Sequence, residues 1–310
     1  LVGSEMCIRD RYRLLAVHAH PDDEASKGAA TLARYADEGH TVMVATLTGG
    51  ERGDVLNPTI TDPAIREHLH DVRIQEMAAS ASILGVHHRW LGFVDSGLPE
   101  GDPLLNLPEG SFASLDPYTA AEPLVRLIRE FRPHVIITYD ENGGYPHPDH
   151  IQAHRVSMIA WHEAGNPAAF PDSGRPWQAF KIYFDRNLTR ERFKAFDKEY
   201  QRRHLASPYG ELLDKWGKDK GRGFERATTC VECGDYFAQR EKALQAHATQ
   251  IDPTSVFFFA PLDIQRVAWP WEHFELASTR VPVSLPEKGL FTQLPENTEI
   301  DASTIRPELL

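Results

Sequence analysis

Residues 13–24 read RLLAVHAHPDDE, an apolar run that ends in a cluster of titratable side chains. The segment 13–19 is short and almost continuously apolar, which is typical of a strand buried on both faces of a parallel sheet. An alanine-rich segment, 24–38, follows and stops at Gly39, as a helix does. The next apolar run, 41–47 (TVMVATL), has the pattern of a second strand. Together these segments predict a strand–helix–strand unit.

The same alternation continues along the chain. Apolar runs predict strands at 88–93, 134–139 and 180–184, and helical patterns occur at 62–84, 119–131 and 149–163. Strands that alternate with helices predict an α/β fold, with a mostly parallel sheet and helices on both faces. The pattern weakens after about residue 186, where we expect a C-terminal mixed α/β lid or subdomain that packs on the core without a clear linker. We expect residues 1–12 to be a disordered or non-native leader.

Charge and cysteine content narrow the classes of function. The 310 residues include 45 acidic and 33 basic side chains, which gives a net charge of −12. A nucleic-acid surface needs clustered Lys and Arg, so this balance favours a small-molecule substrate. No apolar run approaches the roughly 18 residues of a membrane-spanning helix, so we expect no membrane span. The three cysteines, Cys7, Cys230 and Cys233, form no even-numbered disulfide framework, which favours a cytoplasmic location.

Two of the predicted strands end in unusual polar loops. The first loop is His20-Pro21-Asp22-Asp23, and the second is 140–150, DENGGYPHPDH. In open α/β sheets, ligands bind outside the carboxyl ends of the strands. We therefore expect the two loops to contribute to one site.

The spacing of His20 and Asp23, H-x-x-D at a strand-to-helix turn, allows both side chains to reach one metal ion. A catalytic zinc site has three protein ligands, drawn from imidazoles and carboxylates, and an open position. His150, at the start of a later helix, can supply the third ligand. We predict one Zn²⁺ per chain, with Fe²⁺ as the alternative, because two histidines and a carboxylate suit both metals.

Three further residues of the two loops, Asp22, His147 and Asp149, are adjacent to these ligands. A metal-dependent hydrolase needs a carboxylate that takes a proton from water and an imidazole held by a carboxylate. Either motif alone is more typical of a turn capped by Asp, or of an ordinary surface or core histidine. Both motifs together, at strand ends of one sheet, favour metal-dependent hydrolysis. Asp22 argues against a module that only binds metal or sugar, since such a module needs no base.

Four motifs carry a resemblance to a known family: AHPDDE at 19–24, TLTGGERGD at 46–54, DSGLP at 95–99 and PHPDH at 146–150. In this combination the chain resembles the LmbE/PIG-L family of zinc-dependent N-deacetylases and amidases, over about residues 13–275. The resemblance implies a Rossmann-like catalytic core at 13–186 and a C-terminal portion, 187–310, that caps the pocket.

The resemblance also implies roles for the motif residues. The zinc ligands would be His20, Asp23 and His150, the general base Asp22, the general acid or oxyanion stabiliser His147, and the residue that orients this imidazole Asp149. Tyr145 matches a mobile tyrosine that helps to polarise the scissile carbonyl. We expect Glu24 to start the helix and to support the ligands.

Within the family, the chain is most similar to amidases that act on mycothiol S-conjugates. That similarity implies hydrolysis of the amide bond of this small-molecule thiol conjugate, to a mercapturic acid (an N-acetylcysteine S-conjugate) and glucosaminyl-inositol, in the detoxification of electrophiles and drugs. The alternative is deacetylation of N-acetylglucosaminyl-inositol in mycothiol biosynthesis, or of another N-acetyl sugar. The sequence leaves a homo-oligomer open.

Four side chains are candidates for substrate binding. Lys27 resembles a lysine of the amidases and is expected to contact the thiol-conjugate portion, although a solvated helix lysine is an equally ordinary interpretation. Arg73 and Asp95 resemble an arginine and an aspartate that hold sugar and inositol hydroxyls. The spacing of Arg73 and Glu76 also suits a simple helix ion pair. Glu51 in the glycine-rich loop is the fourth candidate.

Overall fold

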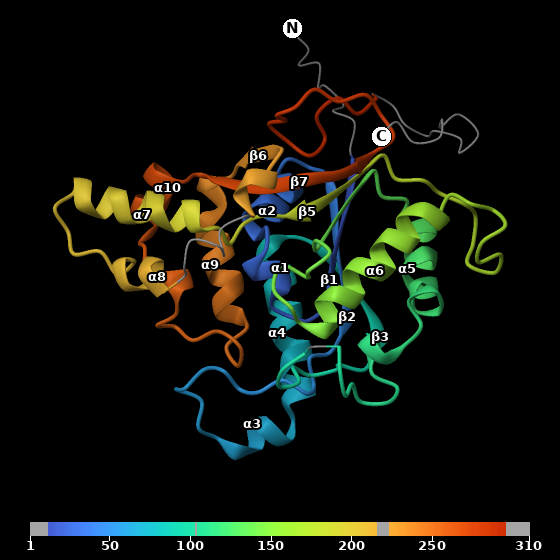
Figure 1. The fold of residues 1–310 in the computed structure, drawn as a ribbon, viewed down its shortest axis with the longest axis horizontal. Helices are drawn as coiled ribbons and strands as arrows, with labels where there is room; N and C mark the ends of the chain where they lie inside the picture. The colour runs from blue at the N-terminus through green and yellow to red at the C-terminus, as the bar shows by residue number, and fades with distance from the viewer. Residues whose placement is uncertain (1–11, 103, 216–222, 296–310) are drawn as a thin grey trace, which may run out of the picture.

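Five parallel strands form the first part of a single sheet in the computed structural model, which describes residues 12–102, 104–215 and 223–295. They are β1 (Arg13–His18), β2 (Thr41–Thr48), β3 (His87–Phe93), β4 (Val135–Thr138) and β5 (Lys181–Asp185). Strand β7 (Trp271–Thr279) pairs antiparallel with β5 on one side and with β6 (Thr229–Glu232) on the other. The order of the sheet is β3-β2-β1-β4-β5-β7-β6 (Figure 1). The predicted α/β class, with a mostly parallel sheet, is confirmed.

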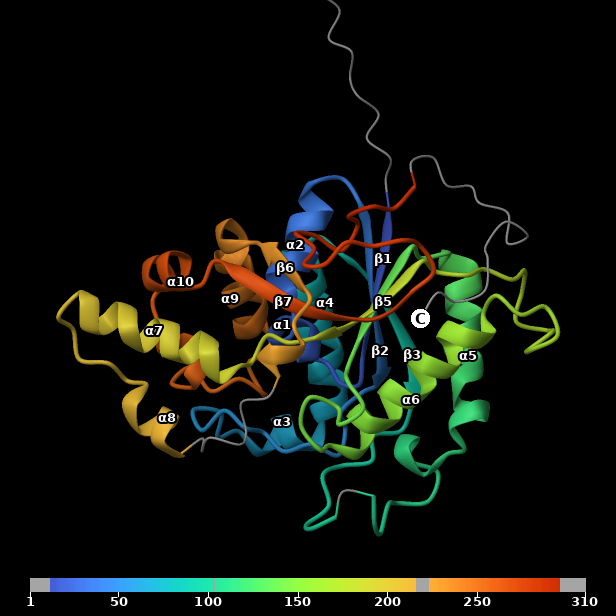
Figure 2. The same cartoon turned by 45° about the horizontal axis from the view of Figure 1, so that its top comes forward.

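Helices cover both faces of this sheet (Figures 1 and 2). Their bounds are α1 (Asp23–Ser26), α2 (Ala29–Asp37), α3 (Pro63–Glu67), α4 (Leu69–Leu84), α5 (Pro117–Phe131), α6 (Pro148–Glu163), α7 (Arg190–Arg202), α8 (Gly210–Lys215), α9 (Phe237–Ala246) and α10 (Leu262–Ala268). Helices α5 and α6 lie against one face, and α2 and α4 lie against the other. None of these helices is long and apolar enough to cross a membrane.

The side chains of β1 alternate between these two layers. Leu15 and Val17 pack with α5 and α6, whereas Leu14 and Ala16 pack with α2 and α4. Successive side chains of a strand point to opposite faces, so a strand covered on both faces needs apolar residues at almost every position. This is why the continuous apolar run of the sequence predicted the strand correctly.

The predicted helix at 24–38 is divided into α1 and α2 by Gly28. Gly28 has φ +98°, a conformation that residues with a Cβ rarely adopt, and a Cβ there would lie 3.4 Å from the ring of Phe274. The break ends α1 after a single turn. The predicted helix at 62–84 is similarly divided into α3 and α4, at His68.

The C-terminal third adds its own apolar cluster beside the sheet. Helices α7, α8 and α10 contribute Phe193, Phe196, Leu213 and Ile264 to it. Strand β7, which comes from the same third, lies between β5 and β6 in the sheet. The division at residue 186 stays a prediction. Residues 1–11 of the predicted leader lie outside the described residues.

Candidate metal centre

The strand order reverses at β1, because β2 and β3 follow on one side of it and β4 and β5 on the other. In open α/β sheets this reversal, at the carboxyl ends of the strands, is where ligands bind. The loop after β1 carries His20 and Asp23, and the loop after β4 leads to His150 in the first turn of α6. The fold thus brings the two polar loops of the sequence together.

Three side-chain atoms of these residues form a triangle. The Nδ1 atom of His20 lies 3.2 Å from Nε2 of His150 and 3.5 Å from Oδ2 of Asp23, and the last two atoms are 3.4 Å apart. Ligand atoms about 2.0–2.2 Å from a tetrahedral zinc ion are about 3.3–3.6 Å apart. All three residues are buried. Both the donor types and their spacing therefore fit a catalytic zinc site.

Hydrogen bonds orient the two imidazoles of this triangle. Nδ1 of His150 lies 2.9 Å from the carbonyl oxygen of Gly143, which leaves Nε2 free of a proton in the neutral ring. On the far side of His20, Nε2 lies 3.2 Å from Oδ2 of Asp149 and 3.5 Å from Oδ1 of Asp95. Carboxylates that hold the second nitrogen of a metal-binding imidazole in this way fix its tautomer and orientation.

Besides this triangle, two overlapping groups of donors in the described part of the chain are close enough to hold a metal ion, His20 with His147 and His150, and His20 with Asp95 and Asp149. The second group lies on the Nε2 side of His20, where the carboxylates serve as hydrogen-bond acceptors. We therefore favour the Nδ1 side of His20 as the metal-facing side, where Asp23 and His150 lie.

The surroundings shift the pKa values of these groups strongly. Burial lowers the pKa of His20, but hydrogen bonds with Asp149, Asp23 and Asp95 outweigh it and raise the pKa well above the usual value. Burial likewise opposes ionisation of Asp23, yet electrostatic interactions with His150 and Lys27 hold its pKa well below the usual range. The site is therefore arranged around an ionised Asp23, the form that binds metals.

Asp23 is held by two side chains besides the histidines. The hydroxyl of Tyr139 donates to Oδ2 at 2.6 Å and accepts a hydrogen bond from the amide of Ala19 at 2.8 Å. Lys27 donates to the other carboxylate oxygen, Oδ1, and to Oγ of Ser26. Lys27, predicted as a substrate contact, is thus buried against a candidate ligand. Tyr139 was not predicted, although its place at the end of an apolar strand, directly before Asp140, is a usable signal.

Asp22 lies beside the triangle in a constrained backbone conformation, with φ +109°. The carboxylate of Glu24 accepts from the amide of Asp22 at 3.0 Å. It also accepts from Oγ of Ser80 at 2.5 Å and pairs with Nε2 of His247 at 2.6 Å. Burial disfavours the ionised form of Glu24, but His247 and Ser80 lower its pKa to about 2. A buried ion pair between Glu24 and His247, the C-cap of α9, thus holds the turn that carries Asp22, and support of the metal ligands by Glu24 stays a prediction.

Arg73 binds three groups around this turn. It donates to the carbonyl oxygens of Gly50 and Pro21 at 2.7 and 2.6 Å, and to Oδ2 of Asp22 at 3.3 Å. Burial raises the pKa of Asp22, and the charge of Arg73 opposes this shift. The arginine therefore connects the loops after β1 and β2.

The loops after β2 and β3 are connected in the same way. Oε1 of Glu51 accepts from the amide of Asp95 at 2.9 Å, and Oδ2 of Asp95 accepts from the amide of Arg52 at 2.9 Å. Ser96, which sequence reasoning missed, donates from its amide to Asp149 at 2.9 Å and from its hydroxyl as well. Its position directly after Asp95, behind a strand, is the signal that could have identified it.

His147 is the N-cap of α6, and its Nδ1 atom accepts from the amide of Asp149 at 3.2 Å. Burial, followed by the charges of His20 and His150, lowers the pKa of His147 to about 3. The neutral ring therefore carries its proton on Nε2. The carboxylate of Asp149 contacts His20 and Ser96, so its predicted role in orienting His147 stays a prediction.

Tyr145 lies at the edge of the centre and is 48% exposed. Its ring meets that of His150 edge-on, with centroids 4.7 Å apart. The loop that carries it is held by Asp140, which accepts from the amide of Gly144 at 2.8 Å and pairs with Arg186. Arg186 directly follows β5, and its charge pair with Asp140 could not be inferred from spacing along the chain.

Replacing Tyr139 by Phe tests whether the contacts of Asp23 matter for metal binding. We expect zinc affinity to fall by about 10–100-fold, because the outer contacts of metal ligands typically contribute that much. The measurement is competition with a chelator of known zinc affinity. Tyr145→Phe is the matched control, because it removes a hydroxyl but keeps the half-exposed ring and its contact with His150, and it should leave the affinity unchanged. Equal affinities for the Tyr139 variant and the unaltered protein would contradict the expected role.

Comparisons with known proteins show which proteins the chain is similar to. The family model described as PIG-L, GlcNAc-PI de-N-acetylase, matches residues 15–161. The mycothiol S-conjugate amidase of Streptomyces coelicolor is 52% identical over 295 residues, which are 93% of this chain and 99% of that protein. The 1D-myo-inositol 2-acetamido-2-deoxy-alpha-D-glucopyranoside deacetylase of Streptomyces scabiei is 37% identical over 92% of this chain and 90% of that protein.

Solved structures are similar in fold at low sequence identity. The N,N'-diacetylchitobiose deacetylase of Pyrococcus horikoshii superposes with a TM-score of 0.56 at 17% identity, over 86% of this chain and 84% of that one. The conserved protein TT1542 of Thermus thermophilus superposes with a TM-score of 0.54 at 22% identity, over 87% of this chain and 96% of that one.

Proposed function

Because the chain belongs to the PIG-L family and is a hydrolase of linear amide C–N bonds, we propose that it cleaves mycothiol S-conjugates with the help of zinc. The products would be a mercapturic acid and glucosaminyl-inositol. The observation that carries the chemistry is the buried triangle of His20, Asp23 and His150, with Asp22 next to Asp23 along the chain and in electrostatic interaction with it. Support for the substrate comes from the 52% identity to an amidase with this activity in its name.

The donor set suits zinc, and iron(II) is the alternative for the same two histidines and carboxylate. When bound, such a metal polarises a carbonyl oxygen and makes water more acidic. Proton transfer, stabilisation of the developing negative charge and substrate binding would fall to the side chains described next.

Asp22 would act as the general base. The side chain of Asp22 is 22% exposed, so water can reach the carboxylate. Hydrogen bonds with Arg73 and Glu24 fix its position. A base held in one place beside the attacking water removes the proton without first having to be ordered.

His147 would stabilise the negative charge that develops on the amide oxygen. Its Nδ1 atom is occupied by the amide of Asp149, so the proton on Nε2 is available as a donor. Tyr145, at the edge of the site, would add a second donor once substrate is present. Donors placed before the reaction lower the barrier because they need no reorganisation during it. Asp149 would keep the imidazole oriented through its backbone amide.

Four side chains would hold the substrate around this centre. Two of them, Arg73 and Glu51, have unused hydrogen-bonding capacity in the described part of the chain, at Nε and Oε2 respectively. These atoms, with the carboxylate of Asp95, suit the hydroxyl groups of a sugar or an inositol. Lys27 would contact the acyl side, from its position between Asp23 and Tyr145.

One comparison of substrates tests the assignment. The zinc-loaded protein is incubated with a mycothiol S-conjugate and, separately, with N-acetylglucosaminyl-inositol, and release of the free amine is followed. We expect the S-conjugate to give the higher kcat/KM. Faster cleavage of the acetylated sugar would favour the second candidate, the biosynthetic deacetylase, whose named relative is 37% identical to this chain. Zinc binding without amine release from either compound would indicate a binding module.

A further inference from the structure

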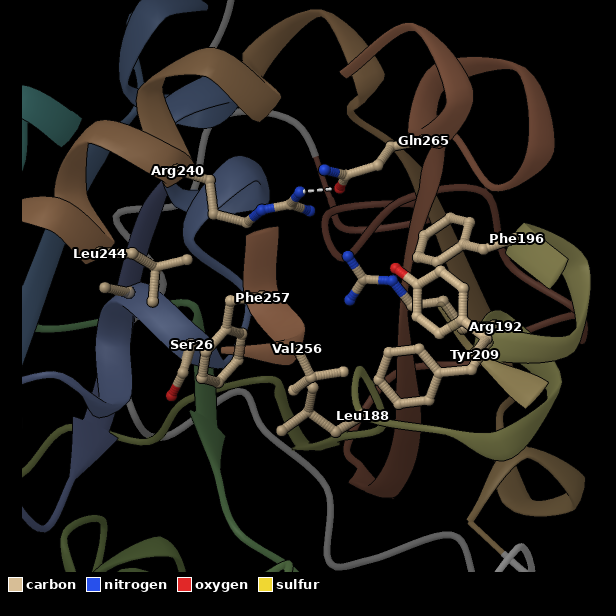
Figure 3. A pocket seen from close by; sticks show the side chains of 12 residues that line it. Ser26, Leu188, Arg192, Phe196, Tyr209, Arg240, Leu244, Val256, Phe257 and Gln265 are labelled. Carbon is tan, nitrogen blue, oxygen red and sulfur yellow. Dashed lines mark hydrogen bonds between the residues drawn. The ribbon is translucent and has the colours of Figure 1, made fainter. Parts of the chain in front are cut away.

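A small cavity lies between α1, α7 and α9, on the side of the sheet where the C-terminal third packs (Figure 3). Aromatic side chains of Phe196, Tyr209 and Phe257 line much of it. Its volume is about 20 Å³, room for about one ordered water molecule or the head of a small ligand. Ser26 of α1 also lines the cavity and accepts a hydrogen bond from Lys27, so the cavity adjoins the metal centre.

Two arginines face each other across this cavity. Arg192 comes from α7 and Arg240 from α9, and Figure 3 shows both guanidinium groups turned toward the same space. Their exposed fractions are only 9% and 5%. One nitrogen of Arg192 donates to the carbonyl oxygen of Asn187 at 3.1 Å, and one of Arg240 donates to the side chain of Gln265.

Each guanidinium keeps a buried donor without an acceptor. Within the described ranges, Nε of Arg192 and Nη1 of Arg240 have no hydrogen-bond partner. Buried polar groups of native proteins almost always have a partner, in the protein, in water or in a ligand. Both arginines line one cavity, so an acceptor bound in that cavity is the partner that these donors lack.

Nearby carboxylates do not neutralise these charges directly. Glu272 acts on both arginines at a distance, but its oxygens accept from the amides of Ala30 and Thr31 at 3.3 and 2.8 Å. Gln265 bonds to Glu241 at 2.8 Å and so separates that carboxylate from Arg240. In a chain with a net charge of −12, two positive groups thus face a cavity whose lining, among the described residues, contains no carboxylate.

Aromatic rings compensate for part of the buried charge. The guanidinium carbon of Arg240 lies 4.0 Å from the ring centroid of Phe237, and that of Arg192 lies 5.4 Å from the centroid of Phe196. Such contacts stabilise a cation through the face of the ring. They do not supply an acceptor for Nε of Arg192 or Nη1 of Arg240. Burial and the charge of Arg240 lower the pKa of Arg192 to about 10.

We propose that this cavity binds a small carboxylate between Arg192 and Arg240. The planar guanidinium fork matches the two oxygens of a carboxylate, which are acceptors only. The carboxylate comes either from solution or from the amide hydrolysis itself, whose acyl product carries one.

Acetate is the probe that tests the site. In saturation-transfer NMR of the zinc-loaded protein, we expect saturable binding of acetate and a matching rise in melting temperature. Acetamide, which is neutral and has the same shape, and chloride at equal ionic strength should give neither effect. Arg192→Gln should weaken acetate binding by at least about tenfold, the value of a hydrogen bond to a charged group. Arg190→Gln, on the same helix but outside the cavity lining, should leave it unchanged.

A second set of measurements keeps the result interpretable. His20→Ala weakens the metal centre, so acetate binding that persists in this variant is not binding to the metal. If Arg192→Gln fails to fold, the Nε–H resonance of Arg192 in the unaltered protein should shift with acetate along the same binding curve. A saturable response that survives Arg192→Gln, that vanishes in His20→Ala, or that acetamide reproduces would overturn the proposal.

Competition separates the two sources of the carboxylate. N-acetylcysteine carries the carboxylate of the expected acyl product, and displacement of acetate by it would assign the cavity to the product. Binding of acetate alone would assign the cavity to a free carboxylate. Both outcomes leave the carboxylate site in place, and the assignment to the product rests on the proposed amidase function.

Discussion

Replacing Asp22 by Asn should leave zinc bound and reduce kcat by about 10²–10⁴-fold, the usual contribution of general acid–base catalysis. The carboxamide has the shape of the carboxylate but cannot take up a proton. The fold should survive, because asparagine is among the residues that tolerate a positive φ best, and the backbone of Asp22 has φ +109°. The remaining amide oxygen can still accept from Arg73. Amine release under single-turnover conditions, with zinc content measured by mass spectrometry, checks both parts of this expectation.

The matched control is Asp62→Asn, the same chemical change at an exposed helix N-cap outside the centre. Asn caps a helix as well as Asp does, so stability and turnover should both stay at the level of the unaltered protein. Near-normal turnover in the Asp22 variant with a full complement of zinc would assign the base to another residue.

Loss of the third ligand should remove both metal and activity. Structural zinc sites bind with about 10–16 kcal/mol shared among four ligands, or about 3 kcal/mol for each. We therefore expect His150→Ala to weaken zinc binding by about 10²–10³-fold. At zinc concentrations that saturate the unaltered protein, the variant should lose most of its turnover, and a large excess of zinc should restore part of it.

His154→Ala is the matched control for this experiment. His154 lies on α6 one turn beyond His150, where its Nδ1 atom is 3.0 Å from the carbonyl oxygen of Tyr139. Its removal should cost some stability and leave zinc affinity intact. If both variants bind zinc as tightly as the unaltered protein does, the triangle of His20, Asp23 and His150 is not the metal site.

Sequence patterns were most reliable where chemistry or burial is local. The runs at 13–19 and 41–47 became β1 and β2, because a strand covered on both faces must be apolar at nearly every position. Strand β7 was missed, since Trp271–Thr279 mixes aromatic and charged residues. Its buried Glu272 is satisfied by amides at the start of α2, more than 200 residues earlier in the chain.

The candidate site likewise has one part that the sequence predicts and one part that only the folded chain shows. Its polar residues stand in two short motifs, and the rule for the ends of parallel strands joins the motifs without knowledge of any contact. The contact of Glu24 with His247, by contrast, spans 223 positions, and that of Tyr139 with Asp23 spans 116. No spacing rule reaches so far, so only the folded chain identifies these partners.

By itself, the sequence determined the fold class, the two loops of the site and the types of donor that they offer, because each depends on a periodicity or on neighbours within a few residues. The tertiary structure decided which nitrogen of His20 faces Asp23 and His150, and what holds Asp22 in place. It alone showed that Arg192 and Arg240 share a cavity. The physical reason is that burial and hydrogen bonding depend on distances in space, and the chain sets those distances only once it has folded.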